Sequence, residues 1–401
     1  MNARLDIAPE PPLACTDDAA GRRKLSVHEE RRTTLPTPKP DLAAYERERR
    51  LALATSPRRL INYMRYKLSQ RKADIGHLPI KLDIENVSRC NFACTMCQVS
   101  DWPKRQRAAD MSLADFKALI DSQYGLVEIK IQGMGEPLLQ GDDFFAMVRY
   151  ARARHIWVRT TTNASLLHLN DNYRKLVDSG VNDIQVSFDG ADKATYEKIR
   201  VGGKFEKVMA NCRLLNDYCA ETGRVTPQMW VVVQQDNVGQ FFELIERAHE
   251  MGFGRLTFAL NLNDWGQDRW QQANSAVTVE DSVPMEQAWA AVKRGRELGI
   301  EVAFWNNTQK FSADTPDRLC PWPFERAYVA SDMRVVPCCM IGTPAVSDLG
   351  DAADFSGQWR GDAYREFRQA HIDGNIPRAC QNCYESRATG PQESPRESQA
   401  S

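Results

Sequence analysis

Short apolar segments alternate with amphipathic segments between residues 81 and 261. Segments such as KLDIENV (81–87) and IWVRTTTN (156–163) are rich in β-branched and aromatic residues, which is typical of strands. DDFFAMVRYARAR (142–154) instead repeats apolar residues at helical spacing. The pattern predicts strands over 81–87, 127–133, 156–163, 182–190, 228–235 and 255–261, and helices over 112–123, 142–154, 170–180 and 239–252, with further helical stretches up to about residue 221 and over about 284–298.

The alternation of strands and helices predicts an α/β fold made of parallel βαβ units. Six repeats are too few to close an eight-stranded barrel, so we expect an open, partial (β/α)6 barrel of the TIM type over residues 79–300. In such barrels the chemistry lies at the carboxyl ends of the strands. We therefore expect functional residues directly after each predicted strand.

The regions on either side of this barrel have different compositions. Residues 1–40 and 387–401 lack periodicity and are rich in polar residues and Pro, which predicts disorder. Residues 41–78 predict a helical arm, interrupted near Ser56-Pro57, for which a packed structural role and a partner-binding role both stay open. Residues 301–386 predict a small cysteine-rich domain.

Charge and hydropathy exclude several classes of protein. The chain has 52 Lys and Arg against 53 Asp and Glu, a balance that argues against a nucleic-acid partner. No apolar run is long enough to predict a transmembrane helix, and the N-terminus lacks the apolar core of a signal peptide. We therefore expect a cytoplasmic protein without a membrane partner.

Seven of the eleven cysteines form two groups with the spacing of metal ligands, and we interpret Cys15, Cys212 and Cys219 as small apolar residues. The first group has the spacing C-x3-C-x2-C in the loop after the first predicted strand. Three thiolates suit a [4Fe–4S] cluster with one open iron, whereas structural zinc usually takes four ligands. A zinc site and a redox C-x2-C pair remain alternatives. These candidate ligands are Cys90, Cys94 and Cys97.

The second group provides four thiolates, enough for a closed cluster or a tetrahedral zinc site. Cys380 and Cys383 form a chelating C-x2-C pair. Cys338 lies at a predicted strand end, and Cys320 completes the set. Cys339, next to Cys338, has no assigned partner.

The first group and the turns after the later strands resemble the radical S-adenosylmethionine (SAM) superfamily. Gly133-Met134-Gly135-Glu136-Pro137 is similar to its Gly-Gly-Glu-Pro turn, with Met134 replacing a glycine, and Thr162-Asn163-Ala164 to its Thr-Asn-Gly turn. The resemblance implies that the turn bearing Glu136 binds the amino group of SAM and that Arg200 pairs with its carboxylate. It implies a SAM-binding site composed of Gly135, Glu136, Asn163, Ser187, Arg200 and Gln234.

The second group resembles the auxiliary-cluster domain called SPASM, in its shortened Twitch form. No cysteine follows Cys383, so the resemblance implies a single auxiliary [4Fe–4S] cluster with four cysteine ligands. The family usually has glycine where Met333 stands, five residues before a ligand, which favours Cys338 over Cys339 as that ligand. Structural zinc remains the alternative for this site.

The resemblance implies an oxidoreductase that reductively cleaves SAM and abstracts a hydrogen atom from its substrate. The implied electron donor is of the flavodoxin or ferredoxin type. With no separate peptide-recognition domain evident, we expect a small polar substrate such as a sugar or aminocyclitol, and a net dehydrogenation. The alternatives are an epimerase, a peptide or protein maturase, and a non-catalytic iron–sulfur or zinc protein. Asp264 and Cys339 are the candidate catalytic residues, although a solvated loop acid and a packed thiol are the structural alternatives.

Overall fold

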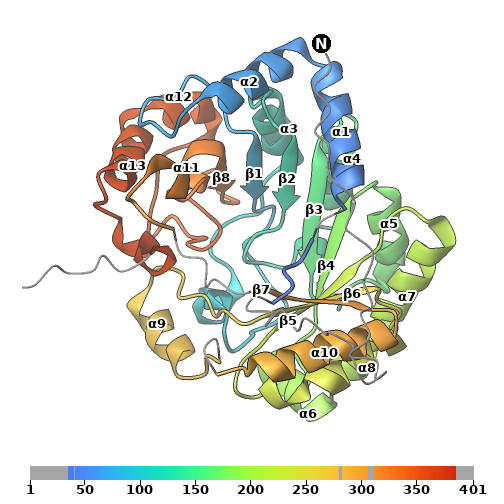
Figure 1. Ribbon diagram of the computed structural model, residues 1–401. Coiled ribbons are helices and arrows are strands. Elements are labelled where there is room, and N and C mark those ends of the chain that lie inside the picture. Colours follow the sequence, from blue (N-terminus) through green and yellow to red (C-terminus); the bar gives the residue numbers. More distant parts are fainter. Residues whose placement is uncertain (1–34, 40, 280–281, 306–310, 385–401) are drawn as a thin grey trace, which may run out of the picture. The chain divides into compact units, whose positions relative to one another are not determined.

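The computed structural model describes residues 35–39, 41–279, 282–305 and 311–384 (Figure 1). The segments predicted to be disordered, and Cys15 with them, therefore lie almost entirely outside the described residues. The strands are β1 (Lys81–Ile84), β2 (Glu128–Ile131), β3 (Trp157–Thr162), β4 (Asp183–Ser187), β5 (Gln228–Val232), β6 (Arg255–Ala259), β7 (Glu301–Trp305), β8 (Arg326–Val329) and β9 (Val335–Val336). The helices are α1 (Leu42–Ala54), α2 (Pro57–Leu68), α3 (Leu113–Ser122), α4 (Asp142–Arg152), α5 (Asn172–Asp178), α6 (Lys193–Ile199), α7 (Phe205–Thr222), α8 (Phe241–Glu250), α9 (Asp268–Ser275), α10 (Met285–Glu297), α11 (Trp322–Glu325), α12 (Phe355–Arg360) and α13 (Asp362–Ile372).

The described strands form one sheet in the order β7-β6-β5-β4-β3-β2-β1-β8-β9. All neighbours from β7 to β8 are parallel, and only β9 is antiparallel to its neighbour. The six predicted strands lie side by side in sequence order, which confirms the predicted α/β fold. Figure 1 shows the strands turning progressively from β1 to β7, with α5, α7, α8 and α10 along one side of the curved sheet.

Both edges of the six-stranded core carry a strand that the sequence pattern did not predict. β7 pairs with β6 over its whole length, and β8, from the cysteine-rich region, pairs with β1. The domain boundary expected at residue 300 therefore falls inside one continuous sheet. The physical reason is that an open barrel has two edges with unpaired backbone groups, and additional strands satisfy them.

The two faces of the sheet differ in polarity. Leu82, Ile84, Ile129 and Ile131 are completely buried in the apolar core. Alternate residues point to the opposite face, which we call the inner face. It carries a row of residues paired across neighbouring strands: Asp83 (β1), Lys130 (β2), Arg159 (β3) and Asp183 (β4).

The arm before the barrel consists of two helices with ordinary capping. Asp41 caps α1, and Ser56 caps α2 ahead of Pro57. Arg59 fixes this arm to the barrel, because its buried guanidinium donates to the carbonyl oxygens of Tyr124 and Arg154. Among the described residues, no helix is both long and apolar enough to cross a membrane.

Candidate active site

The loop after β1 places three cysteines beside the segment that contains Arg200. The Ala93 amide donates to the Val201 carbonyl at 2.8 Å, and the Thr95 amide to the Ile199 carbonyl at 3.1 Å. These bonds hold the loop on the C-terminal end of α6 and the residues directly after it. Cys90, Cys94 and Cys97 therefore lie at the carboxyl end of the sheet, as predicted for a barrel site.

The environment of these thiols fits a bound cluster. Burial raises the pKa of Cys97 to about 12 and also raises the pKa values of Cys90 and Cys94. Thiolates at these positions need a compensating positive charge, and iron provides one. The same loop supplies three thiols, which fits the expected three-cysteine ligand set. Across the described residues, no group of three His, Cys, Asp or Glu side chains is arranged around a single-ion site.

Gly135 allows the turn after β2 to approach the cysteine loop closely. A Cβ atom at this position would lie 2.2 Å from the Arg89 carbonyl oxygen and 2.6 Å from that of Val87. The next residue completes the contact, because the Glu136 amide donates to the Arg89 carbonyl at 2.9 Å. The turn and the cysteine loop therefore form one packed unit.

The Glu136 carboxylate is buried and accepts three internal hydrogen bonds. Its donors are the Thr162 hydroxyl at 2.7 Å, the Asn163 amide at 2.7 Å and the Leu138 amide at 3.2 Å. Burial raises the pKa of Glu136 to about 7, although these donors favour the ionised form. The carboxylate thus ties the end of β2 to the end of β3. Glu136 therefore positions the turn after β2, in addition to the contact with the SAM amino group that the sequence predicts for this turn.

Asn163 continues this network to the cysteine loop. Its Nδ2 donates to Asn91 Oδ1 at 3.0 Å, and its Oδ1 accepts from the Ser165 amide at 2.9 Å. Asn91 also donates to the Ser165 hydroxyl at 2.8 Å. The predicted Thr-Asn turn is therefore bonded directly to the residue after Cys90.

Arg200 has a buried partner that sequence reasoning missed. Its Nε donates to Asp189 Oδ2 at 2.5 Å, and Asp189 is completely buried. The Nη1 of Arg200 lies 3.8 Å from Cys94 Sγ. Burial alone would lower the pKa of Arg200, but Asp189 and Cys94 raise it above its ordinary value. The Ser187-Phe188-Asp189-Gly190 motif was the available signal, because it places this carboxylate directly after β4.

Two buried amides near the strand ends have unused hydrogen-bonding atoms. Gln234 Nε2 and Gln132 Oε1 have no partner among the described residues. Ser187 is also buried at the end of β4. Because buried polar atoms are normally hydrogen-bonded, these atoms fit contacts to a bound polar cofactor.

The second cysteine group is drawn from three separate segments. Electrostatic interaction links Cys338 to Cys380 and Cys320, and links Cys320 to Cys380 and Cys383. Burial is the main cause that raises the pKa values of Cys320, Cys338 and Cys380. The four thiols thus lie near one another, and their role as ligands of one auxiliary site stays a prediction.

Cys339 has a different environment from Cys338. Burial and then the Asp83 carboxylate raise the pKa of Cys339 to about 12, whereas Lys130 and Arg326 lower it. These three neighbours belong to the inner face of the sheet. The structure therefore places Cys339 toward the barrel, with its neighbour Cys338 among the other cysteines.

Asp264 contacts the C-terminal cysteine segment. Its Oδ1 accepts from the Gly266 amide at 2.9 Å, and its Oδ2 accepts from the Asn382 amide. Asn382 lies between Cys380 and Cys383. Asp264 therefore ties the loop after β6 to the C-terminal cysteine segment, and its catalytic role stays a prediction.

A buried glutamate missed by the sequence analysis links the barrel to the C-terminal region. Glu85 accepts from the Met134 amide, the Tyr328 hydroxyl, the Ser331 amide and Arg107 Nη2, at 2.7 to 3.2 Å. It joins the loop after β1 to the turn after β2 and to the end of β8. No local motif marks this residue.

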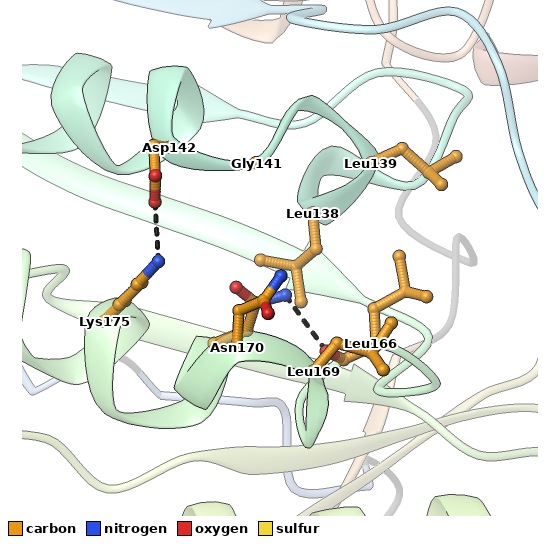
Figure 2. A pocket seen from close by; sticks show the side chains of 9 residues that line it. Leu138, Leu139, Gly141, Asp142, Leu166, Leu169, Asn170 and Lys175 are labelled. Atoms are coloured by element: carbon orange, nitrogen blue, oxygen red, sulfur yellow. Dashed lines mark hydrogen bonds and ion pairs between the residues drawn. The ribbon is translucent and has the colours of Figure 1, made fainter.

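Figure 2 shows a surface depression of about 270 Å³ between the segment that begins α4 and the segment that begins α5. Leu138, Leu166 and Leu169 line it, and an ion pair between Asp142 and Lys175 borders it. None of the predicted site residues lines this depression, so it is separate from the candidate site.

Comparison with known proteins gives two domain matches. Residues 87–248 match the model of the radical SAM superfamily, and residues 320–384 match SPASM, an iron–sulfur cluster-binding domain. Both ranges enclose the respective cysteine groups.

Several characterised proteins are similar to this chain. It is 29% identical to the mycofactocin maturase MftC of Mycolicibacterium smegmatis over 193 residues, 48% of this chain and 47% of that protein. It is 25% identical to the PqqA peptide cyclase of Gluconobacter oxydans over 265 residues, 65% and 70% of the two chains. It is 36% identical to the GTP 3′,8-cyclase of Aliarcobacter butzleri over 138 residues, 32% and 41%. The chain thus spans about half the length of the MftC proteins that it matches.

Solved structures share the fold. Streptococcus suis SuiB bound to its precursor peptide SuiA aligns with a TM-score of 0.58 at 16% identity, covering 74% of this chain and 67% of SuiB. At this identity the likeness concerns the fold alone.

Proposed function

We propose that this chain, which carries a radical SAM domain followed by a SPASM domain, is a maturase that modifies a peptide substrate. The two domains confirm the cofactors expected from sequence: a SAM-binding [4Fe–4S] cluster, an auxiliary cluster and SAM. When bound, these groups supply a 5′-deoxyadenosyl radical for hydrogen-atom abstraction and an acceptor for one electron.

The extent of the matches supports a peptide substrate over the small polar molecule expected from sequence. The match to the PqqA peptide cyclase covers 65% of this chain. The match to a cyclase that acts on GTP covers only 32%. The observation that carries the proposal is this longer shared region with an enzyme named for a peptide. It favours the maturase alternative.

The described residues support distinct roles within this function. Cys90, Cys94 and Cys97 would hold the SAM-binding cluster. Arg200, fixed by Asp189, would direct its remaining guanidinium donors at the SAM carboxylate. Glu136 would keep the turn after β2 in place through its bonds to Thr162 and Asn163. The backbone carbonyl groups of this turn would then face the SAM amino group.

The C-terminal domain would hold the auxiliary cluster through Cys320, Cys338, Cys380 and Cys383. A flavodoxin or ferredoxin-type protein in the cytoplasm would supply the electron for SAM cleavage. These assignments complete the proposed enzyme as a peptide oxidoreductase.

Epimerisation is a second candidate because Cys339 lies beside Asp83 on the inner face. A thiol there would return a hydrogen atom to a substrate radical. Turnover in deuterated water separates the two reactions. An epimerase places one solvent deuterium on a product carbon and loses product formation in Cys339→Ala, whereas the proposed oxidation introduces none and survives this substitution.

The substrate class is tested by measuring whether a substrate fraction stimulates SAM cleavage, an experiment that we call the coupling assay. Anaerobically reconstituted enzyme is incubated with SAM, a reductant and either the peptide fraction or the small-molecule fraction of a cell extract, and 5′-deoxyadenosine is measured. We expect the peptide fraction to stimulate its formation and prior protease digestion to abolish the stimulation. Cys94→Ala is the inactive control. Stimulation that survives proteolysis, or that comes only from small molecules, would overturn the peptide assignment.

A further inference from the structure

One cation on the inner face lacks a carboxylate partner. Arg159, on the neighbouring strand, pairs with Asp183 at 3.0 Å. Lys130 instead donates to the neutral side-chain oxygen of Gln185 at 3.4 Å. Among the described residues, no carboxylate lies within ion-pair distance of its ammonium group. Lys130 also keeps partial access to solvent, although its neighbours on β2 are buried.

Asp83, the register partner of Lys130 on β1, has hydrogen-bonding capacity to spare. It is only 3% exposed, and its Oδ1 accepts no hydrogen bond. This oxygen forms an ion pair with Arg326 Nε at 3.7 Å, which is longer than a hydrogen bond. The thiol of Cys339 is near all three residues. The Lys130 ammonium group and Asp83 Oδ1 thus both keep hydrogen-bonding capacity at one place.

A partly buried ammonium group without a carboxylate partner is a favourable place for an anionic ligand. Buried charges in proteins are normally paired, and burial lowers the pKa of Lys130. Lys130 lies one residue before the end of β2, whose following turn contains Glu136, and beside Cys339, the neighbour of Cys338. The group therefore lies on the strand that leads to the turn bearing Glu136, and near the residue that follows Cys338.

We propose that Lys130 binds a carboxylate of the substrate on the inner face, while Asp83 accepts an N–H donor from the same molecule. This inference rests on the proposed function, because a peptide segment supplies both groups. The carboxylate comes from an acidic side chain or from the peptide C-terminus. Lys130 is thus a specificity-determining residue for the part of the peptide that is modified.

The test measures binding without turnover. Reconstituted holoenzyme with SAM and without reductant is titrated with three probes by saturation-transfer NMR. N-acetylglutamine has a terminal carboxylate, N-acetylglutamate α-amide has a side-chain carboxylate, and N-acetylglutamine amide is neutral. Wild type is compared with Lys130→Met and Lys130→Arg. Lys175→Met, which removes a surface lysine paired with Asp142, is the matched control.

We expect at least one charged probe to bind wild type about tenfold more tightly than the neutral probe, as a charge-assisted hydrogen bond implies. The charged probe that does so identifies the source of the carboxylate. The preference should fall below twofold in Lys130→Met and persist in Lys130→Arg and Lys175→Met. Iron content and SAM affinity show that each variant is folded.

Equal binding of charged and neutral probes to wild type, or a preference unchanged in Lys130→Met, would overturn the proposal. The outcome is separate from that of the coupling assay. If extract peptides fail to stimulate SAM cleavage but the Lys130-dependent preference holds, the carboxylate site stands and the peptide assignment fails.

Discussion

At the scale of single residues, the candidate site depends on contacts that tolerate no additional atoms. Gly135 is the clearest case, since two backbone carbonyl oxygens occupy the space of a side chain. Neither carbonyl can rotate away without moving the cysteine loop. A substitution here therefore reports directly on the packing between the turn after β2 and the loop after β1.

Gly135→Ala should destabilise the protein by about 1–3 kcal/mol, as overpacking does, and should reduce SAM affinity and iron in the first cluster. Gly76→Ala is the control, because a Cβ there meets no atom within 4 Å. Thermal unfolding of the apo protein and SAM titration of the holoenzyme measure the two effects. Equal behaviour of both variants would contradict the packing described for the turn.

Arg200→Met should be more damaging than the removal of an exposed arginine. It leaves the Asp189 carboxylate buried without its charged partner, which costs about 3–5 kcal/mol. Arg224→Met removes a surface partner of Asp178 and should cost less than about 1 kcal/mol. Chemical denaturation of the apo variants measures both, and SAM titration should show weakened binding in Arg200→Met alone.

Sequence predicted those site residues that belong to local motifs. Cys90, Glu136 and Arg200 were identified because each lies in a short segment with a recognisable pattern. Glu85 and Lys130 were missed because their neighbours come from segments distant in sequence. Such contacts depend on how the whole chain folds, which no local pattern contains.

At the scale of elements, the strands of the six predicted repeats could be derived almost completely from sequence. Their periodicity is strong, and signals such as the Ser112 cap of α3 mark where a helix begins. β7 and β8 could not be derived in the same way. Each is recognisable as part of the barrel only through the sheet edge that it covers.

A substitution in the C-terminal cysteine segment should remove the auxiliary cluster without affecting the first cluster. Cys380→Ala should lower the iron content from about eight to about four atoms per chain, because one of two four-iron clusters is lost. SAM cleavage should continue while modified product falls at least tenfold. Iron analysis and product detection by mass spectrometry give the two readouts.

Cys219→Ala is the matched control for this experiment, since Cys219 is buried within α7, away from both cysteine groups. It should keep its full iron content. Two results would contradict the prediction that the two clusters occupy separate sites. One is an unchanged iron content in Cys380→Ala, and the other is that this variant loses SAM cleavage together with the auxiliary cluster.

At the scale of the whole molecule, Glu85 connects the two halves of the proposed chemistry. Its carboxylate receives a hydrogen bond from the turn after β2, and two from the region after α11, namely Tyr328 and Ser331. Arg107 supplies the counter-charge at 2.7 Å. One completely buried side chain thereby joins the turn that bears Glu136 to the end of β8, the strand that precedes Cys338 in the chain.

Glu85→Ala should therefore weaken both regions at once, with a loss of about 3–5 kcal/mol, because Arg107 loses its buried partner and the donors of Met134, Tyr328 and Ser331 lose their acceptor. Asp332→Asn is the matched control, because Asp332 is the other partner of Arg107 but its side chain is 35% exposed. We expect Glu85→Ala to lower SAM affinity and retention of the auxiliary cluster together, and Asp332→Asn to change neither by more than about twofold. Iron analysis in Cys380→Ala and Cys94→Ala backgrounds assigns each loss to one cluster. If Glu85→Ala affected only SAM affinity or only the auxiliary cluster, the prediction that this carboxylate stabilises both regions together would be wrong.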